Sequence, residues 1–209
     1  MGEVTTFLVL LRGINVGGKN KVAMADLKTC LEGLGLRDVS TFIVSGNVVL
    51  TSDRNADEIA AQIETALPQA FSLDSELIKV LVLTRDQLQA VVDHRPKGFG
   101  DQPDKYHSDA IFLIGVESAE VMPIFHPREG VDRVWPGKGV VYSERLSAQR
   151  TKSRLSAMMA SPLYQSMTIR SWNTTVKLLE LLNARDTHED GCLAEPDLAL
   201  RPGSSPSSG

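Results

Sequence analysis

A short turn between two strand-like segments restricts the fold of this chain more than any other feature. Residues 39–44 and 48–51 are rich in apolar and β-branched side chains, and Ser45-Gly46-Asn47 separates them. Two strands joined by so short a turn pair as an antiparallel hairpin. Parallel strands need a much longer crossover between them. We therefore expect an antiparallel sheet in the first part of the chain.

The segments around this hairpin alternate between strand and helix patterns. Residues 5–11 are almost continuously apolar, which is typical of a buried strand. Apolar residues spaced by three and four predict a helix from Met24 to Leu34, and similar spacing predicts another over residues 55–67. Residues 77–83 have the pattern of a fourth strand. The resulting order is β-α-β-β-α-β, the split β-α-β arrangement of a ferredoxin-like unit.

The second half of the chain repeats this order with weaker patterns. An extra helix is predicted after each unit, beginning at Thr84 and at Asn173. Predicted strands lie at residues 110–114, 131–135, 140–143 and 167–170, and predicted helices at 117–125 and 151–160. The sequence thus predicts an α+β protein of two ferredoxin-like subdomains in tandem, at residues 1–94 and 108–183, joined by a connecting loop at 95–107 and followed by a disordered C-terminal tail at 184–209.

The net charge of the chain is concentrated in its last residues. Of the net charge of −4, the segment from Asn183 onward accounts for −3, so residues 1–182 carry only −1. A nearly neutral body argues weakly against a dedicated nucleic-acid-binding protein but leaves a local basic face open. Two cysteines are too few for a disulfide framework, and no apolar run is long enough to span a membrane. We expect a cytoplasmic protein with no membrane partner.

The segment directly after the first strand combines three glycines with cations. The glycines at positions 13, 17 and 18 permit positive φ angles and a close approach of the backbone to a ligand. Arg12, Lys19 and Lys21 supply charged hydrogen-bond donors, and a helix pattern begins soon afterwards. This arrangement suits a phosphate or a carboxylate. The alternative is a glycine-rich loop that packs on a neighbouring strand and leaves its cations in water.

A partial match to a nucleotide-binding P-loop does not extend to its essential positions. Gly13, Gly18 and Lys19 have the Walker A spacing, but Asn20 stands where Ser or Thr would bind Mg²⁺. The helix pattern begins late, near Ala23, and the next two strands form a hairpin rather than a parallel crossover. These features argue against a P-loop nucleotide hydrolase.

Other polar residues are candidate contacts for the same ligand. In the split β-α-β layout the third strand lies beside the first, so Ser45 and Asn47 are expected at the same end of the sheet as the Arg12 loop. Arg154 ends a basic stretch that begins at Arg145 and suits phosphate contacts. The alternatives are that the first two residues only shape a turn, and that the basic stretch is a solvated helix start.

Arg170 and Trp172 place a cation close in sequence to a ring that can stack on a base, although such a tryptophan also serves as a packing anchor. The four histidines are scattered without metal-ligand spacing, and no Gly-x-Ser-x-Gly elbow occurs. No catalytic residue, metal or cofactor is predicted, and the sequence leaves open whether the protein is an enzyme.

Three motifs resemble the domain-of-unknown-function 1697 family. They are residues 11–22 (LRGINVGGKNKV), residues 45–49 (SGNVV), and Arg170-Ser171-Trp172-Asn173-Thr174 followed by Lys177-Leu178. The three motifs bracket residues 5–182. Two positions depart from the family pattern, since Ala23 stands where proline is common and Ser171 where asparagine is common, which removes one candidate amide ligand. The resemblance implies an α+β protein with ferredoxin-like subdomains and no established activity.

Three hypotheses follow for the function. The leading one is a protein that binds a phosphate-bearing ligand, a nucleotide or a nucleic acid, through Arg12, Asn15, Lys19, Asn20, Lys21, Ser45, Asn47, Arg154, Arg170, Trp172 and Asn173. The second is an enzyme that acts on a small anionic substrate in a cleft between the subdomains, favoured if Asp or His residues gather beside the Arg12 loop. The third is a structural or homo-oligomeric module, favoured if Arg12 and Asn15 are buried and have partners within the chain.

Overall fold

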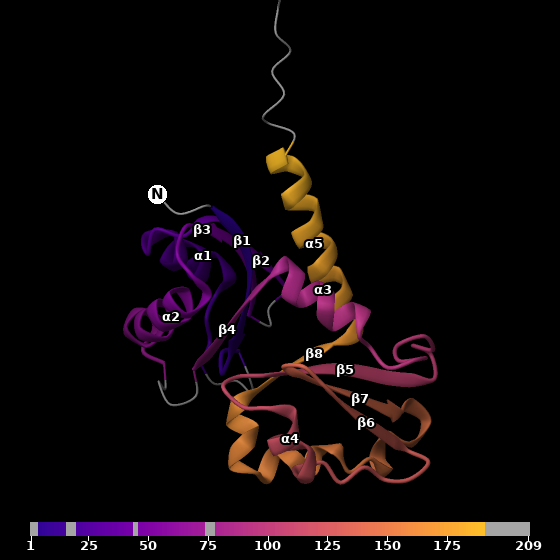
Figure 1. Cartoon of the computed structure of the whole chain (residues 1–209). Coiled ribbons are helices and arrows are strands. Elements are labelled where there is room, and N and C mark those ends of the chain that lie inside the picture. Colours follow the sequence, from indigo (N-terminus) through magenta and orange to yellow (C-terminus); the bar gives the residue numbers. More distant parts are fainter. Residues whose placement is uncertain (1–3, 16–19, 44–45, 74–77, 191–209) are drawn as a thin grey trace, which may run out of the picture.

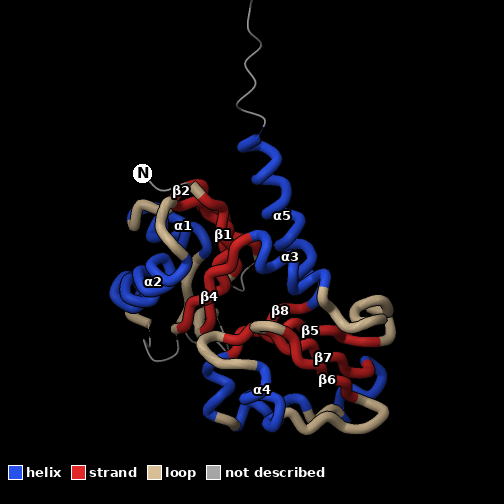
Figure 2. The backbone as a smooth tube through the Cα atoms, in the orientation of Figure 1, coloured by secondary structure: helices blue, strands red, loops and turns tan. Residues whose placement is uncertain are grey.

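The computed structural model of the protein describes residues 4–15, 20–43, 46–73 and 78–190 (Figure 1). Two four-stranded antiparallel sheets and the helices that pack on them make up an α+β architecture (Figure 2). Most of the predicted tail, from residue 191, lies outside the described residues. In the part of the chain that is described, no helix has the length and apolar character needed to cross a membrane.

The first sheet contains the predicted hairpin. Its strands are β1 (Thr5–Arg12), β2 (Arg37–Phe42), β3 (Asn47–Ser52) and β4 (Lys79–Thr84), in the order β2-β3-β1-β4. Each neighbouring pair is antiparallel, and β1 is paired on both sides. A central strand is buried on both faces, which explains why residues 6–11 are apolar almost without interruption.

Two helices cover one face of this sheet. Helix α1 (Met24–Gly33) and helix α2 (Ala56–Phe71) pack their apolar side chains against alternate residues of β1 in one hydrophobic cluster. Helix α2 begins with a capping box, in which the Asn55 side chain accepts from the Glu58 N–H and the Glu58 carboxylate accepts from the Asn55 N–H. This cap fixes the start of the helix where the sequence predicted it.

The second sheet repeats the strand order of the first. Its strands are β5 (Tyr106–Leu113), β6 (Asp132–Gly137), β7 (Val140–Leu146) and β8 (Met167–Ser171), in the order β6-β7-β5-β8. Strand β5 begins at Tyr106, inside the predicted connecting loop, because its first residues pair with the end of β7. The first crossover contains α4 (Ser118–Val121) and the 3₁₀ helix η2 (Met122–Ile124), in agreement with the short helix predicted there.

The second crossover of this half differs from the prediction. The α-helix expected over residues 151–160 is replaced by three 3₁₀ helices, η3 (Ser147–Lys152), η4 (Leu155–Ala160) and η5 (Pro162–Ser166). Ser153 and Ser161 interrupt the segment in extended conformations, and their hydroxyls accept from the N–H groups of Leu155 and Leu163. Serine side chains compete in this way with the backbone bonds of a continuous helix.

Helices α3 (Arg85–Asp93) and α5 (Trp172–Asp190) connect the two halves. One buried cluster contains Leu8 and Leu10 of the first sheet, Phe112 and Tyr142 of the second sheet, and apolar residues of both helices. Helix α5 continues to Asp190, past residue 184, where the tail was predicted to begin. The two halves therefore share a hydrophobic core.

Candidate functional site

The hairpin turn lies beside the end of β1, as the strand order predicted. The Leu11 N–H donates to the Gly46 carbonyl at 2.8 Å, and Leu10 is opposite Asn47 in the β1–β3 register. Gly46 has φ +70°, and a Cβ there would lie 2.9 Å from the Leu11 Cβ. A side chain at this position would therefore be strained and would also collide with β1.

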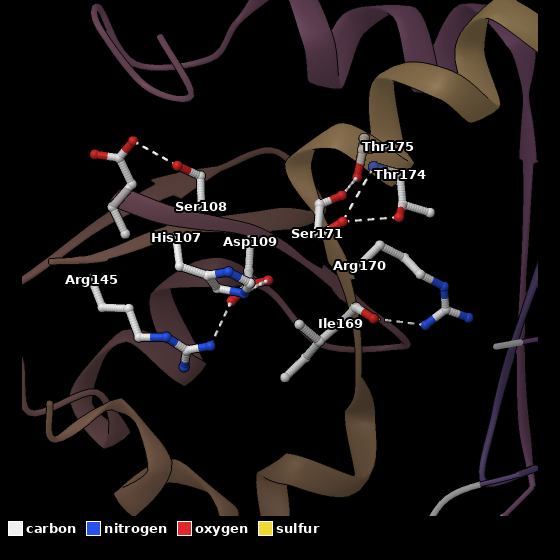
Figure 3. Close-up of polar contacts among 10 residues, drawn as sticks. His107, Ser108, Asp109, Arg145, Ile169, Arg170, Ser171, Thr174 and Thr175 are labelled. Atoms are coloured by element: carbon white, nitrogen blue, oxygen red, sulfur yellow. Dashed lines mark hydrogen bonds and ion pairs between the residues drawn. The ribbon is translucent and has the colours of Figure 1, made fainter. Parts of the chain in front are cut away.

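Arg170 of the third motif reaches across to the first two motifs. Its side chain is buried, its Nε donates to Asn47 Oδ1, and its Nη2 donates to the Leu11 carbonyl at 3.0 Å. Its Nη1 donates to Thr168 Oγ1 at 2.9 Å. The same atom donates to the Ile169 carbonyl at 2.8 Å (Figure 3). All four acceptors are uncharged, and burial lowers the pKa of Arg170 to about 10. The guanidinium remains charged at neutral pH and ties β8 to the first sheet.

Arg12 makes a second connection between the halves. Its Nε donates to the Met167 carbonyl at 3.0 Å, and its guanidinium lies 5.4 Å from the centre of the Tyr164 ring. Both partners belong to the second half of the chain, more than 150 positions away. The arginine that ends the first strand thus binds the edge of the second sheet.

Two asparagines fix the shape of the glycine-rich loop. Asn15 Nδ2 donates to the Val22 carbonyl at 2.9 Å, and its Oδ1 accepts from the Val22 N–H at 2.8 Å. Asn20 Nδ2 donates to the Gly13 carbonyl at 2.8 Å, and the Asn15 N–H donates to the Asn20 carbonyl at 2.9 Å. Both asparagines have positive φ, at 54° and 48°, a conformation that asparagine tolerates better than most residues.

These contacts sort the predicted ligand residues into groups. Five of them, Arg12, Asn15, Asn20, Asn47 and Arg170, have internal hydrogen-bond partners. Arg12 and Asn15 are only partly buried, so the condition set for a structural role is met for their partners and not for full burial. Lys21 is exposed, whereas Lys19 and Ser45 lie outside the described residues. Arg154 has an exposed side chain, and its backbone N–H donates to Asp132 Oδ2 at 2.9 Å in the second half.

A separate polar group lies at one end of the second sheet. His107 Nε2 is 3.1 Å from Asp109 Oδ1, and Arg145 Nη2 is 3.9 Å from Asp109 Oδ2 (Figure 3). His107 is about half exposed, while the Asp109 side chain is 14% exposed. Burial raises the pKa of Asp109 above its usual value, although the charges of His107 and Arg145 act in the opposite direction. The Asp109 carboxylate therefore contacts one ring nitrogen of His107, whose imidazole is accessible to solvent.

A pocket of about 200 Å³ opens beside this histidine. It is formed by the connecting segment around Gly100, the first residues of β5 and the start of α5. His107, Trp172 and Asn173 line it, and none of its described lining residues is an aspartate or glutamate, although Asp109 contacts His107 and Glu144 contacts Gly100 and Ser108 from behind the wall. Ser171 caps the helix, since its Oγ accepts from the Thr174 N–H at 3.3 Å, and the first turn of α5 contains no acid. The positive end of a long helix therefore faces the pocket.

Trp172 is a packing anchor. Its side chain is 6% exposed, and its ring centre is 5.0 Å from that of Phe99 in an edge-to-face contact. A Cβ on Gly100 would lie 2.3 Å from the indole, so the backbone there is in contact with the ring. These contacts give Trp172 a packing role, and its use as a stacking surface for a base stays a prediction. Asn173, next in the chain, is exposed.

The sequence did not single out His107 and Asp109 as a pair. Alternate residues of a strand share one face, so this spacing is a usable signal. It was missed because His107 was assigned to the end of the connecting loop. Among the described residues, no group of three or more His, Cys, Asp or Glu side chains is arranged to hold a metal ion.

Comparison with known proteins gives two matches and one negative result. A family model described as "Protein of unknown function (DUF1697)" matches residues 4–142, which include the first two motifs. The structure is similar to that of the conserved bacterial protein SP0830 from Streptococcus pneumoniae, with a TM-score of 0.70 and 25% identity, over 86% of this chain and 99% of that one. No curated protein matches the chain. The resemblance found in the motifs is confirmed, and the chain belongs to the DUF1697 family of proteins of unknown function.

Proposed function

We propose that this protein binds a small phosphate-bearing ligand in the pocket between His107 and the start of α5. In this proposal Arg12 joins the two halves of the molecule, Asn15 and Asn20 bind neighbouring backbone groups, and none of the three contacts the ligand. The observation that carries the proposal is the composition of the pocket wall. Donor groups and the N-terminal end of a helix meet there, and none of the described lining residues is an acid.

The charges around the pocket support an anionic ligand. Arg95, which pairs with Asp101, lies 5.8 Å from the ring centre of Trp172. Lys105 and Arg133 lie 5.2 and 4.2 Å from the ring centre of Tyr106, and Arg133 pairs with Glu144, so Lys105 is the main cationic support for an anion here. Both rings belong to residues that line the pocket. Phosphate groups bind favourably at the N-terminal end of a helix, where backbone N–H groups lack partners within the helix. The Asn173 amide would add a side-chain donor, and the His107 imidazole lines the same pocket.

The volume of the pocket limits the size of the ligand that it can hold. Pockets for drug-sized molecules occupy roughly 300–1,000 Å³, and this one measures about 200 Å³. It suits inorganic phosphate or the phosphate end of a monoester better than a dinucleotide or a nucleic-acid strand. The nucleic-acid part of the leading hypothesis is therefore not retained.

The strand orders of the two sheets also support a more specific assignment of the fold. Both sheets have the same antiparallel order, and each of the two crossovers in the first half holds one helix, so we assign the halves to the ferredoxin-like class. A cytoplasmic location and self-association into a homo-oligomer stay predictions.

Calorimetric titration with inorganic phosphate and AMP, at low ionic strength, tests the proposed site. His107→Ala and Asn173→Ala are expected to weaken binding at least about fivefold, which corresponds to roughly 1 kcal/mol. His126→Ala is the matched control, since this exposed histidine lies outside the pocket. Lys21→Ala is also expected to bind normally. Loss of binding in Lys21→Ala with normal binding by His107→Ala would assign the ligand to the glycine-rich loop instead.

The His107–Asp109 contact favours a second candidate, an enzyme that acts on a small anionic substrate in the same pocket. A carboxylate that holds one imidazole nitrogen orients the ring and stabilises its protonated form, as general acid–base catalysis requires. Assays of phosphate monoester hydrolysis test this candidate. Turnover that is lost in His107→Gln and retained in His126→Gln would support it, and absence of turnover in the wild type would reject it.

A further inference from the structure

One wall of the pocket depends on a buried carboxylate outside the pocket itself. Glu144 lies on β7, opposite Ser108 of β5 and Arg133 of β6. Its side chain is 1% exposed. Oε1 accepts from the Gly100 N–H at 2.9 Å and from the Ser108 hydroxyl at 2.8 Å, and Oε2 accepts from Arg133 Nη2 at 2.6 Å. Two of these three donors belong to residues that line the pocket.

The hydrogen bond from the Gly100 N–H to Glu144 fixes a residue of the connecting segment that has a positive φ angle and no space for a side chain. Gly100 has φ +76° and lies directly against the Trp172 indole. The neighbouring Phe99 ring inserts into the aromatic cluster with Trp172, Trp135 and Tyr142. The segment therefore has an apolar anchor and, one residue later, a charged acceptor for its backbone. Aromatic packing alone does not specify the direction of the Gly100 N–H, whereas a fixed carboxylate oxygen does.

The negative charge of Glu144 is balanced away from the pocket. Arg133 is half exposed, pairs with the far oxygen of the carboxylate and stacks on Tyr106, which also lines the pocket. The carboxylate thus orders three parts of the wall, while its charge is compensated by a cation on the outer side. This arrangement allows an acid to shape a pocket that receives an anion.

We propose that Glu144 is the positioning residue of this pocket, and that phosphate affinity depends on its carboxylate through the placement of Gly100 and Ser108. This inference rests on the proposed function for its ligand, but the placement of Gly100 is measurable without any ligand. Glu144→Gln keeps the size of the side chain, and removes the charge and one acceptor oxygen. Glu129→Gln is the matched control, because Glu129 is exposed.

Two readouts on the full-length chain test the inference. In Glu144→Gln, hydrogen exchange of the Gly100 amide is expected to accelerate at least tenfold, while exchange of Val9 in the first sheet is unchanged. Affinity for inorganic phosphate is expected to fall at least fivefold. Neither should change in Glu129→Gln. A uniform acceleration of exchange throughout the molecule would mean a general loss of stability and would overturn the positioning role.

A second variant covers the case in which Glu144→Gln does not fold. Arg133→Gln leaves the carboxylate in place and removes its outer partner, so a smaller change in the same direction is expected for both readouts. Unchanged Gly100 exchange or unchanged phosphate affinity in the folded variants overturns the inference. If wild-type protein does not bind phosphate, the proposed function fails and the affinity half of this inference fails with it. The exchange measurement then still decides whether Glu144 positions Gly100.

Discussion

The side chain of Arg170, in the third motif, forms hydrogen bonds with residues of the first two motifs. It is buried, charged and bound to four neutral acceptors, two of which belong to the first two motifs. A buried charge without an opposite charge is costly unless its donors are satisfied. Hydrogen bonds from a charged donor are worth about 1.5–3 kcal/mol each. The motif residues therefore specify how the halves meet.

Removing this side chain should destabilise the whole protein. Arg170→Ala removes the buried donors that bind Asn47 Oδ1 and the Leu11 carbonyl, and we expect the free energy of unfolding in urea to fall by about 2–4 kcal/mol. Lys177→Ala, on the exposed face of α5, serves as the control and should change it by less than about 0.5 kcal/mol. A loss below about 1 kcal/mol in Arg170→Ala would contradict the assigned role.

Asp109 gives a prediction for pH dependence. Its pKa is raised in the folded protein above the ordinary value of 3.8, mainly by burial, so the folded state favours the protonated carboxyl. The stability gained from this preference is present below pH 3.8 and is lost as the pH rises through the folded-state pKa. Asp109→Asn should therefore have a higher Tm than the wild type at pH 7, with a smaller difference at pH 3. Thermal unfolding followed by circular dichroism at both pH values checks this. A lower Tm at pH 7 would mean that the contacts with His107 and Arg145 outweigh the burial cost.

At the scale of elements, the connecting segment is the part that the structure constrains most closely. Two of its glycines, Gly98 and Gly100, have similar φ angles of +80° and +76°. A Cβ on Gly98 would meet no atom within 4 Å, whereas one on Gly100 would lie 2.3 Å from Trp172. A substitution at Gly98 therefore measures the energetic cost of a positive φ angle alone, whereas a substitution at Gly100 adds the cost of a collision with Trp172.

Alanine at these two positions should have different effects. Gly98→Ala is expected to lower the free energy of unfolding by about 1–2 kcal/mol, the cost of a left-handed conformation. Gly100→Ala should lose about 2 kcal/mol more, because the methyl group displaces the indole. Urea unfolding monitored by tryptophan fluorescence measures both. Equal losses would show that the contact with Trp172 is unimportant.

The patterns of β1, α2 and the β2–β3 hairpin were sufficient to predict the first half closely. Each of these elements has a strong local signal, namely a continuous apolar run, a capping box or a short polar turn. The 147–166 crossover was not predictable in the same way. Its apolar positions fit a helix, and only the hydroxyls of Ser153 and Ser161, with Pro162, divide it into 3₁₀ helices. The pocket was also missed, because its wall joins residues near 100, 107, 144 and 172 that no local pattern relates.

At the scale of the whole molecule, the two halves share one buried cluster, and each half also has a buried cluster of its own. Leu8 and Leu10 of the first sheet belong to the same buried cluster as Phe112 and Tyr142 of the second, and Tyr142 Oη donates to the Val91 carbonyl of α3 at 2.7 Å. Arg12 and Arg170 add hydrogen bonds across the same boundary. A tandem of independent subdomains would not share buried side chains in this way.

Unfolding should accordingly occur in one transition. Both tryptophans, Trp135 and Trp172, lie in the second half, so their fluorescence reports on that half and on the cluster it shares with the first sheet. Far-ultraviolet circular dichroism reports on both halves. The urea midpoints from the two signals are expected to coincide. A second transition seen only by circular dichroism would mean that the first half unfolds separately.

The central claim is that a phosphate group binds beside His107 and the start of α5. The most direct test is to map amide chemical-shift changes in ¹⁵N-labelled protein during titration with inorganic phosphate. We expect saturable changes at Trp172, Asn173, Gly100 and His107, with little change at Lys21. Saturable changes confined to Lys21 and its neighbours, or no saturable change at any concentration, would contradict it.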